Sequence, residues 1–180
     1  MNLCCTTFII SGDLSELKPA FYFSNGCLTW QPHNGPPVAK DIIMNRRSDA
    51  RKLALQMLYL VDQNSEQDLT WIRTKIEQDL DNPPLADFAW NLFSSVRENQ
   101  SSIDEQIIGV AKNWKLHRMA ITDRNLLRLG VCEIQHLKSP VPVVLNECIE
   151  LAKEFGTENS ASFVNGLLDK ISSAVDQPNA

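Results

Sequence analysis

The fold is decided by residues 141–171, which read VPVVLNECIELAKEFG (141–156) and then TENSASFVNGLLDKI (157–171). Apolar residues recur there every three or four positions, a spacing that places them on one face of an α-helix. The residues predicted to be buried are Val144, Cys148, Leu151, Ala152 and Phe155, followed by Val164, Leu168, Ile171 and Val175. The stretch therefore predicts two successive amphipathic helices.

A single glycine separates these two helices. We expect Gly156 to end the first helix in the left-handed conformation that glycine adopts easily. Thr157 is the expected N-cap of the second helix, and Glu158 lies where the helix dipole favours a negative charge. The connection is therefore expected to be tight.

The same helical spacing continues through most of the chain after residue 44, without an alternating strand pattern. Helices are expected at 46–63, 69–80, 85–96, 103–114, from about 122 to 134, at 143–155 and at 158–174. Ser48 is the expected N-cap of the first helix, and Trp114 completes the core stripe of the fourth. The chain predicts an all-α bundle of about seven helices with short connections.

Residues 1–43 differ from the rest, because they contain four of the nine prolines and three of the seven glycines. We interpret them as a largely disordered extension, in which Phe8–Ile10 and Phe21–Phe23 are each either a short strand or a sticky tail. Met44 opens the organised part, so the extension is hypothesised to lie upstream of the true start. The expected organisation is an extension at 1–43, a helical domain at 44–176 and a tail at 177–180.

Composition narrows the class of protein. The 180 residues suffice for one domain with a real core, and 43% hydrophobic and 22% charged residues are typical of a soluble globular protein. No apolar run approaches the roughly 18 residues of a membrane-spanning helix, and the N-terminus has no basic region typical of a secretory signal. Five cysteines without a C-x-x-C pair favour a reducing, cytoplasmic location.

Two features suggest contact with nucleic acid. Arg46, Arg47, Arg51 and Lys52 form the densest basic cluster of a chain whose net charge is −5. This cluster is either a solvated helix end or a phosphate-binding arm, because guanidinium groups bind phosphate bidentately. Separately, Phe163 lies at the edge of the predicted buried face, with Asn159 one turn earlier. Its ring either packs at the domain edge or stacks on a nucleobase.

Catalytic sites find little support in the sequence. Glu147 and Glu150 are spaced for one helix face, but the chain lacks the repeated Glu-x-x-His of a di-metal bundle. Residues 163–166, FVNG, lie inside a predicted helix rather than in a nucleotide-binding turn after a strand. No cysteine has the histidine partner of a nucleophile. The residues favour a helical binding module without metal or cofactor over an enzyme.

Three motifs resemble the NusB family of bacterial transcription antitermination factors. The first comprises Ala50, Arg51, Ala54, Gln56, Leu58 and Tyr59, and the second comprises Asp123, Arg124, Leu127–Gly130 and Glu133. The third comprises Asn146, Glu147, Ile149–Lys153, Phe155, Gly156, Phe163–Gly166 and Leu168–Lys170. They span roughly residues 46–171 in the order and spacing of the family, and residues 1–43 lie outside them.

This resemblance implies a fold and a function. NusB proteins consist of two three-helix subdomains, here about 44–108 and 109–176. They pair with NusE, a small-subunit ribosomal protein, and the pair binds the boxA element of nascent ribosomal RNA. Within the antitermination complex of RNA polymerase, this promotes processive transcription and assists ribosomal RNA maturation. The resemblance implies no enzymatic activity and no cofactor.

The resemblance also implies roles for individual residues. Arg46, Arg47 and Arg51 would contact RNA phosphates, Phe163 would stack on a boxA base, and Asn159 would lie beside the RNA. Residues 110–134 would carry the NusE surface, with Arg118, Arg124 and Glu133 as partner-binding residues. The arm is less basic than in much of the family, and Asn159 replaces a frequent acid.

Three alternatives remain open at this point. A related helical domain precedes the catalytic domain of ribosomal RNA cytosine methyltransferases, so the chain could serve such an enzyme. A protein-only adaptor would not use the basic cluster for RNA. Some NusB relatives form homodimers that hide the RNA-binding face.

Overall fold

The computed structural model describes residues 22–24, 27–29, 46–64, 66–111 and 114–175. The chain divides into two compact units, Met1–Val38 and Ala39–Ala180. In the first unit, β1 (Tyr22–Ser24) pairs antiparallel with β2 (Cys27–Thr29). Six residues expected to be part of a disordered extension therefore form a hairpin, and the strand alternative for Phe21–Phe23 agrees with β1. Phe8–Ile10 and the tail at 177–180 lie outside the described residues.

The second unit is helical, as the apolar spacing predicts. Its described helices are α1 (Arg47–Gln63), α2 (Leu69–Asp79), α3 (Pro83–Glu98), α4 (Gln100–Val110), the 3₁₀ turn η2 (Leu116–Arg118), α5 (Ile121–Gln135), α6 (Val141–Phe155) and α7 (Ser160–Val175). Each α-helix overlaps an expected one, and the all-α prediction is confirmed for this unit.

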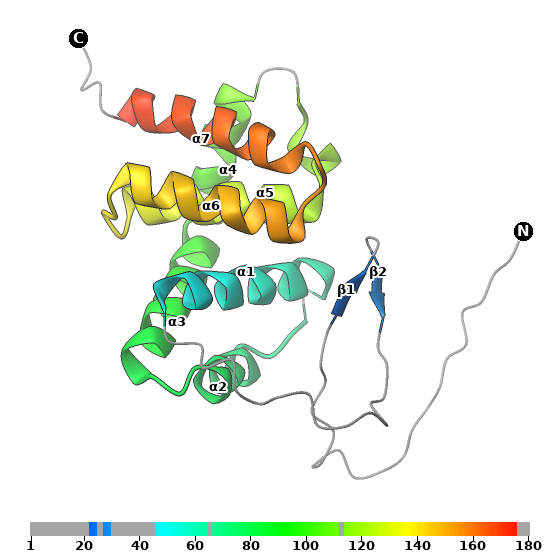
Figure 1. Cartoon of the computed structure of the whole chain (residues 1–180), viewed down its shortest axis with the longest axis vertical. Coiled ribbons are helices and arrows are strands. Elements are labelled where there is room, and N and C mark those ends of the chain that lie inside the picture. Colours follow the sequence, from blue (N-terminus) through cyan, green and yellow to red (C-terminus); the bar gives the residue numbers. More distant parts are fainter. Residues whose placement is uncertain (1–21, 25–26, 30–45, 65, 112–113, 176–180) are drawn as a thin grey trace, which may run out of the picture. The chain divides into compact units, whose positions relative to one another are not determined.

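The helices form two groups that meet at α5. Helices α1, α2 and α3 pack together, and α5, α6 and α7 pack together, with α4 against α3, α5 and α7. Figure 1 shows α1–α3 on one side and α4–α7 on the other. Helix α5 contacts α1 and α3 as well as α6 and α7, so it forms the centre of the bundle. The boundary between residues 108 and 109 stays a prediction, and it falls within α4.

The central position of α5 explains its burial. Every residue from Asn125 to Ile134 is buried, and Leu126, Leu127 and Leu129 are fully enclosed. A helix surrounded on all sides must also bury its polar residues, which then need partners inside the protein. Helix α5 therefore brings Asn125, Arg128 and Glu133 into the interior.

Gly130 allows α5, α6 and α7 to approach closely. A Cβ atom at this position would lie 2.7 Å from Leu168 Cδ1 on α7 and 3.2 Å from Cys148 Sγ on α6. Any larger residue would push these side chains apart, at a cost of about 1–3 kcal/mol for overpacking. The glycine of the second motif thus has a packing role.

The connection between α6 and α7 differs from the expectation. Gly156 has φ −95° and ψ −167°, an extended rather than a left-handed conformation. A Cβ atom at Gly156 would lie 2.6 Å from the Ala152 carbonyl oxygen, so the position needs a glycine for space. Helix α7 begins at Ser160, whose Oγ accepts the Thr157 N–H at 2.8 Å. Asn159 directly precedes α7, so Thr157 does not occupy the expected N-cap position.

Two further helix ends are corrected. Arg46, not Ser48, precedes α1, and Ser48 lies inside the helix and donates to Glu147 Oε1 at 2.9 Å. Helix α4 ends at Val110, so Trp114 lies beyond it and its core stripe does not reach that far. Trp114 is 54% exposed instead of buried.

Candidate nucleic-acid interface

The exposed start of α1 carries two arginines. Arg46 precedes the helix and donates its backbone N–H to Asp49 Oδ2 at 3.0 Å, whereas Arg47 is the first helical residue. Both side chains are exposed, and neither forms an ion pair with a carboxylate in the described part of the chain. The Arg47 guanidinium carbon lies 5.3 Å from the centre of the Phe88 ring. Two free cations at a helix N-terminus can hold a phosphate, since the dipole also favours an anion there.

Arg51 does not belong to this exposed arm, which corrects one expected RNA contact. Its side chain is 3% exposed and donates to Glu133 through Nε at 2.8 Å and through Nη2 at 2.5 Å. Glu147 Oε2 lies 3.5 Å from Arg51 Nη1. Burial alone would lower the pKa of Arg51, but the hydrogen bond and charge of Glu133 raise it above its ordinary value. Arg51 therefore stays charged inside the protein and joins α1 to α5 and α6.

The three residues expected to bind a partner protein also differ in how deeply they are buried. Glu133 is fully buried, so it cannot contact a partner protein and is corrected to the internal partner of Arg51. Arg124 donates to Asp62 Oδ2 at 2.9 Å, and its side chain is only 17% exposed. Arg118 in η2 is exposed. Of these three residues, Arg118 alone has an exposed side chain without a recorded ion pair among the described residues.

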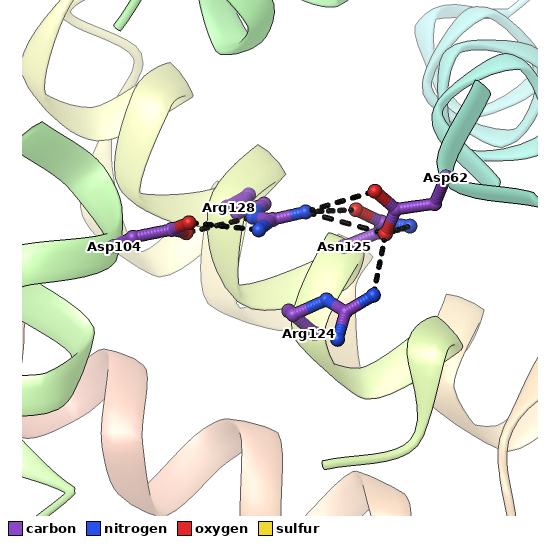
Figure 2. Close-up of polar contacts among 5 residues, drawn as sticks. All are labelled: Asp62, Asp104, Arg124, Asn125 and Arg128. Atoms are coloured by element: carbon purple, nitrogen blue, oxygen red, sulfur yellow. Dashed lines mark hydrogen bonds and ion pairs between the residues drawn. The ribbon is translucent and has the colours of Figure 1, made fainter. Parts of the chain in front are cut away.

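A polar network that the sequence did not predict joins α1, α4 and α5 (Figure 2). Arg128 on α5 donates to both carboxylate oxygens of Asp104 on α4, at 2.7 and 2.8 Å. Its Nη1 donates to Asn125 at 3.1 Å and to Asp62 on α1 at 3.3 Å. Arg124 approaches the same Asp62 from the next turn. The network fixes helices relative to one another and uses most of the Arg128 donors inside the protein.

An aromatic pair lies at the start of α7, formed by the exposed Trp114 and by Phe163, which packs against the hydrophobic core. Phe163 is half-buried, and the centre of its ring lies 5.3 Å from that of Trp114, with the planes inclined by 63°. Asn159 is exposed one turn earlier, and its backbone oxygen accepts the Phe163 N–H at 3.1 Å. The predicted neighbours Asn159 and Phe163 thus lie together, and Trp114 adds a ring that sequence periodicity had assigned to the core. Such rings can stack on unpaired bases.

A buried contact holds the start of α7 against α5. Asp123 is 9% exposed and hydrogen-bonds with the Ser160 side chain, which is itself 1% exposed. Burial raises the pKa of Asp123 above its ordinary value, and the hydrogen bond with Ser160 partly opposes this shift. Asp123 Oδ1 has no hydrogen-bond partner within the described chain. The contact fixes the helix turn from which Phe163 projects.

The predicted RNA residues therefore form two separate patches. Arg46 and Arg47 lie at the start of α1, whereas Asn159 and Phe163 lie at the start of α7, next to Trp114, which was not predicted to bind RNA. Among the described residues, no recorded contact joins the two patches. A bound strand would have to span them.

The described helical residues contain no metal-binding cluster and no reactive cysteine. No group of three or more His, Cys, Asp or Glu side chains there could hold a metal ion. Burial raises the pKa of both Cys132 and Cys148 to about 12, so these thiols stay protonated at neutral pH and are poor nucleophiles. Among the helices described, none has the length and apolarity to cross a membrane.

Comparison with known proteins gives one consistent family. The sequence profile of the NusB family matches residues 48–173. The transcription antitermination protein NusB of Anaeromyxobacter dehalogenans (strain 2CP-1) is 42% identical over 133 residues, which cover 73% of this chain and 93% of the relative.

Solved structures agree in fold. NusB of T. maritima is 33% identical, with a TM-score of 0.65, covering 71% of this chain and 91% of that one. A crystal structure of the antitermination factors NusB and NusE in complex with double-stranded RNA contains a chain that is 30% identical. Its TM-score is 0.64, and the match covers 71% of this chain and 96% of that one. The chain therefore belongs to the NusB family of transcription antitermination proteins, which are not enzymes.

Proposed function

We propose that this protein binds boxA-type single-stranded RNA together with NusE. In nascent ribosomal RNA transcripts, this binding would support processive transcription by the antitermination complex of RNA polymerase and ribosomal RNA maturation. The observation that carries the proposal is the aromatic pair of the exposed Trp114 and the half-buried Phe163, because rings at the surface beside polar groups suit unpaired bases. The solved complex of a similar NusB chain with NusE and double-stranded RNA supports the coarser part of the proposal, RNA binding together with NusE.

The two surface patches have complementary roles in this proposal. Arg46 and Arg47 contact phosphates, since both cations are exposed and lack a carboxylate partner among the described residues. Phe163 stacks on one base, and Asn159 lies beside the strand without adding negative charge. Arg51 acts indirectly, because its buried ion pair with Glu133 fixes the helix that carries the arginines.

NusE is proposed to contact the region from residue 110 to residue 134. The accessible part of this region includes Arg118 in η2 and the outer edge of Arg124. Glu133 contributes only by holding α1 against α5. Because η2 follows Trp114 closely in the chain, the NusE surface would adjoin the aromatic pair, so that RNA could touch both proteins.

The test is a fluorescence titration of labelled boxA-type RNA with the full chain, with and without NusE. We expect tighter binding with NusE. Phe163→Ala should weaken binding about 5- to 100-fold, the usual loss for one stacked base. Trp71→Ala is a matched control, because Trp71 is an exposed ring on the distant α2.

No RNA binding with or without NusE would contradict the proposal and favour a protein-only adaptor. Sedimentation of the same sample would distinguish a homodimer that hides the RNA-binding face, since such a dimer should bind RNA after dilution.

A further inference from the structure

We propose that Trp114 is a second base-stacking residue, so that Trp114 and Phe163 together bind two successive bases of single-stranded RNA. This inference rests on the proposed RNA-binding function. Trp114 lies between α4 and η2, outside any helix, and is 54% exposed. It is more exposed than the half-buried Phe163. Among the described side chains, Trp114 makes the only recorded ring contact with Phe163.

The ring geometry determines how bases would bind. The two ring centres are 5.3 Å apart and the planes are inclined by 63°. A base cannot enter between rings that are so close and so steeply inclined. Each ring therefore offers a separate outer face, and two neighbouring bases would stack at an angle to one another. Single-stranded RNA can adopt this splayed arrangement, whereas stacked duplex bases cannot.

The charged neighbours of Trp114 favour RNA as the ligand. Lys115 follows directly and is exposed, and it forms no ion pair in the described part of this acidic chain. His117 and Arg118 are exposed within the next three residues. A ring followed by cations matches single-strand binding, in which bases stack on aromatic side chains while positive charges follow the backbone.

The experiment compares Trp114→Ala, Trp114→Phe and Trp114→Leu in the complex with NusE, using labelled boxA-type RNA. We expect Trp114→Ala and Trp114→Leu to weaken binding about 5- to 100-fold and Trp114→Phe to retain most of the affinity, because only phenylalanine keeps an aromatic face. The salt dependence should stay unchanged, since no phosphate contact is removed.

Tryptophan emission gives a direct readout of stacking. RNA should quench the emission of the wild-type protein, and Trp114→Phe should abolish most of this quenching while still binding RNA. Because Trp114 is exposed, these variants should keep the circular dichroism and unfolding midpoint of the wild type.

The other outcomes each overturn the inference in a distinguishable way. If wild type binds RNA and Trp114→Ala binds equally well, the inference fails and the proposed function stands. If Trp114→Leu binds RNA as well as Trp114→Phe, an aromatic ring is not required at this position, and the stacking inference fails. If Trp114→Ala weakens NusE binding without RNA, the residue contacts the partner protein. If wild type binds no RNA, the proposed function fails and the inference fails with it.

Discussion

Arg47 and Arg51 lie one turn apart on α1, yet their exposure and their ion pairing differ. Both guanidinium groups approach the Phe88 ring, at 5.3 and 5.4 Å from its centre. Arg47 is exposed, whereas Arg51 is 3% exposed and bound to Glu133. The comparison teaches that burial, not residue type, separates the arginines that build the fold from those free to bind a ligand.

The aromatic residues repeat this difference. Phe93 is 1% exposed and contacts the half-buried Trp90, with ring centres 5.7 Å apart. Phe163 and Trp114 form a similar pair at the surface. Phe93 stabilises the fold from within the core, and we propose that Trp114 and Phe163 at the surface bind bases. Substitutions at the buried Arg51 and Phe93 should therefore change stability, and substitutions at the exposed Arg47 and Trp114 should change RNA affinity.

The largest effect is expected from Glu133→Ala, which leaves the Arg51 charge buried without its main partner. The free energy of unfolding should fall by about 3–5 kcal/mol. Denaturant unfolding measures this loss. Glu154→Ala is the control, because its ion pair with Lys52 is largely exposed and should contribute less than about 1 kcal/mol. Equal losses in the two variants would contradict the contrast between buried and exposed pairs.

Arg128→Ala should have the next largest effect on stability. It removes the bonds to Asp104 and Asp62, and both carboxylates are less than one-fifth exposed. We expect a loss of about 2–3 kcal/mol, reduced by partial solvation of the two acids. Lys153→Ala, which breaks an exposed pair with Glu150, should cost well under about 1 kcal/mol. A native unfolding midpoint for Arg128→Ala would refute the structural role of the network.

The double variant Arg46→Ala with Arg47→Ala should change binding without changing stability. The slope of log affinity against log salt should fall by roughly 1.4, because each phosphate contact on a single strand contributes about 0.7. Affinity at low salt should fall about tenfold, or ~1.4 kcal/mol. Arg97→Ala removes another exposed arginine and serves as the control. An unchanged slope in the double variant would favour the protein-only adaptor.

Asn159→Asp should weaken RNA binding about two- to fivefold at low salt, the range expected for one exposed charge interaction. The effect should disappear at high salt, because screening removes repulsion between exposed charges. Asn165→Asp is the matched control, an exposed asparagine on another face of α7. Equal effects of the two substitutions would place Asn159 away from the strand.

The smallest effect is expected from Asp123→Asn. The pKa of Asp123 is raised in the folded protein above its ordinary value of 3.8, so its ionisation costs stability as pH rises through the folded pKa. At pH 7 the variant should be as stable as wild type or more stable by up to about 1 kcal/mol. This difference should shrink as pH falls toward 3.8. A gain that grows on acidification would contradict the raised pKa.

The helices could be predicted because their apolar spacing is regular. The family followed from three motifs, and Phe163 could be placed at the edge of a buried face. The sequence does not decide between strand and tail for Phe21–Phe23, because short apolar segments without periodicity do not distinguish the two, and it makes no prediction for β2.

Burial of charged residues was harder to predict. Arg51 lies in register with Ala54 and Leu58, and Glu133 with Leu126 and Leu129, so opposite charges on two buried faces were a signal for an internal ion pair. The pairing of Arg51 on α1 with Glu133 on α5 depends on how the two helices pack, which periodicity alone does not determine. The exposure of Trp114 could not be inferred from periodicity, because α4 ends at Val110 and helical spacing does not apply beyond it.

The salt dependence of RNA affinity in the NusE complex tests most directly whether the exposed Arg46 and Arg47 bind RNA while the buried Arg51 does not. The measurement compares wild type, Arg46→Ala with Arg47→Ala, and Arg51→Met with Glu133→Leu, a double variant that replaces the buried ion pair by apolar side chains. We predict a reduced slope only when the exposed arginines are removed. An equal reduction in the folded Arg51→Met, Glu133→Leu variant would show that Arg51 contacts RNA and would contradict the account.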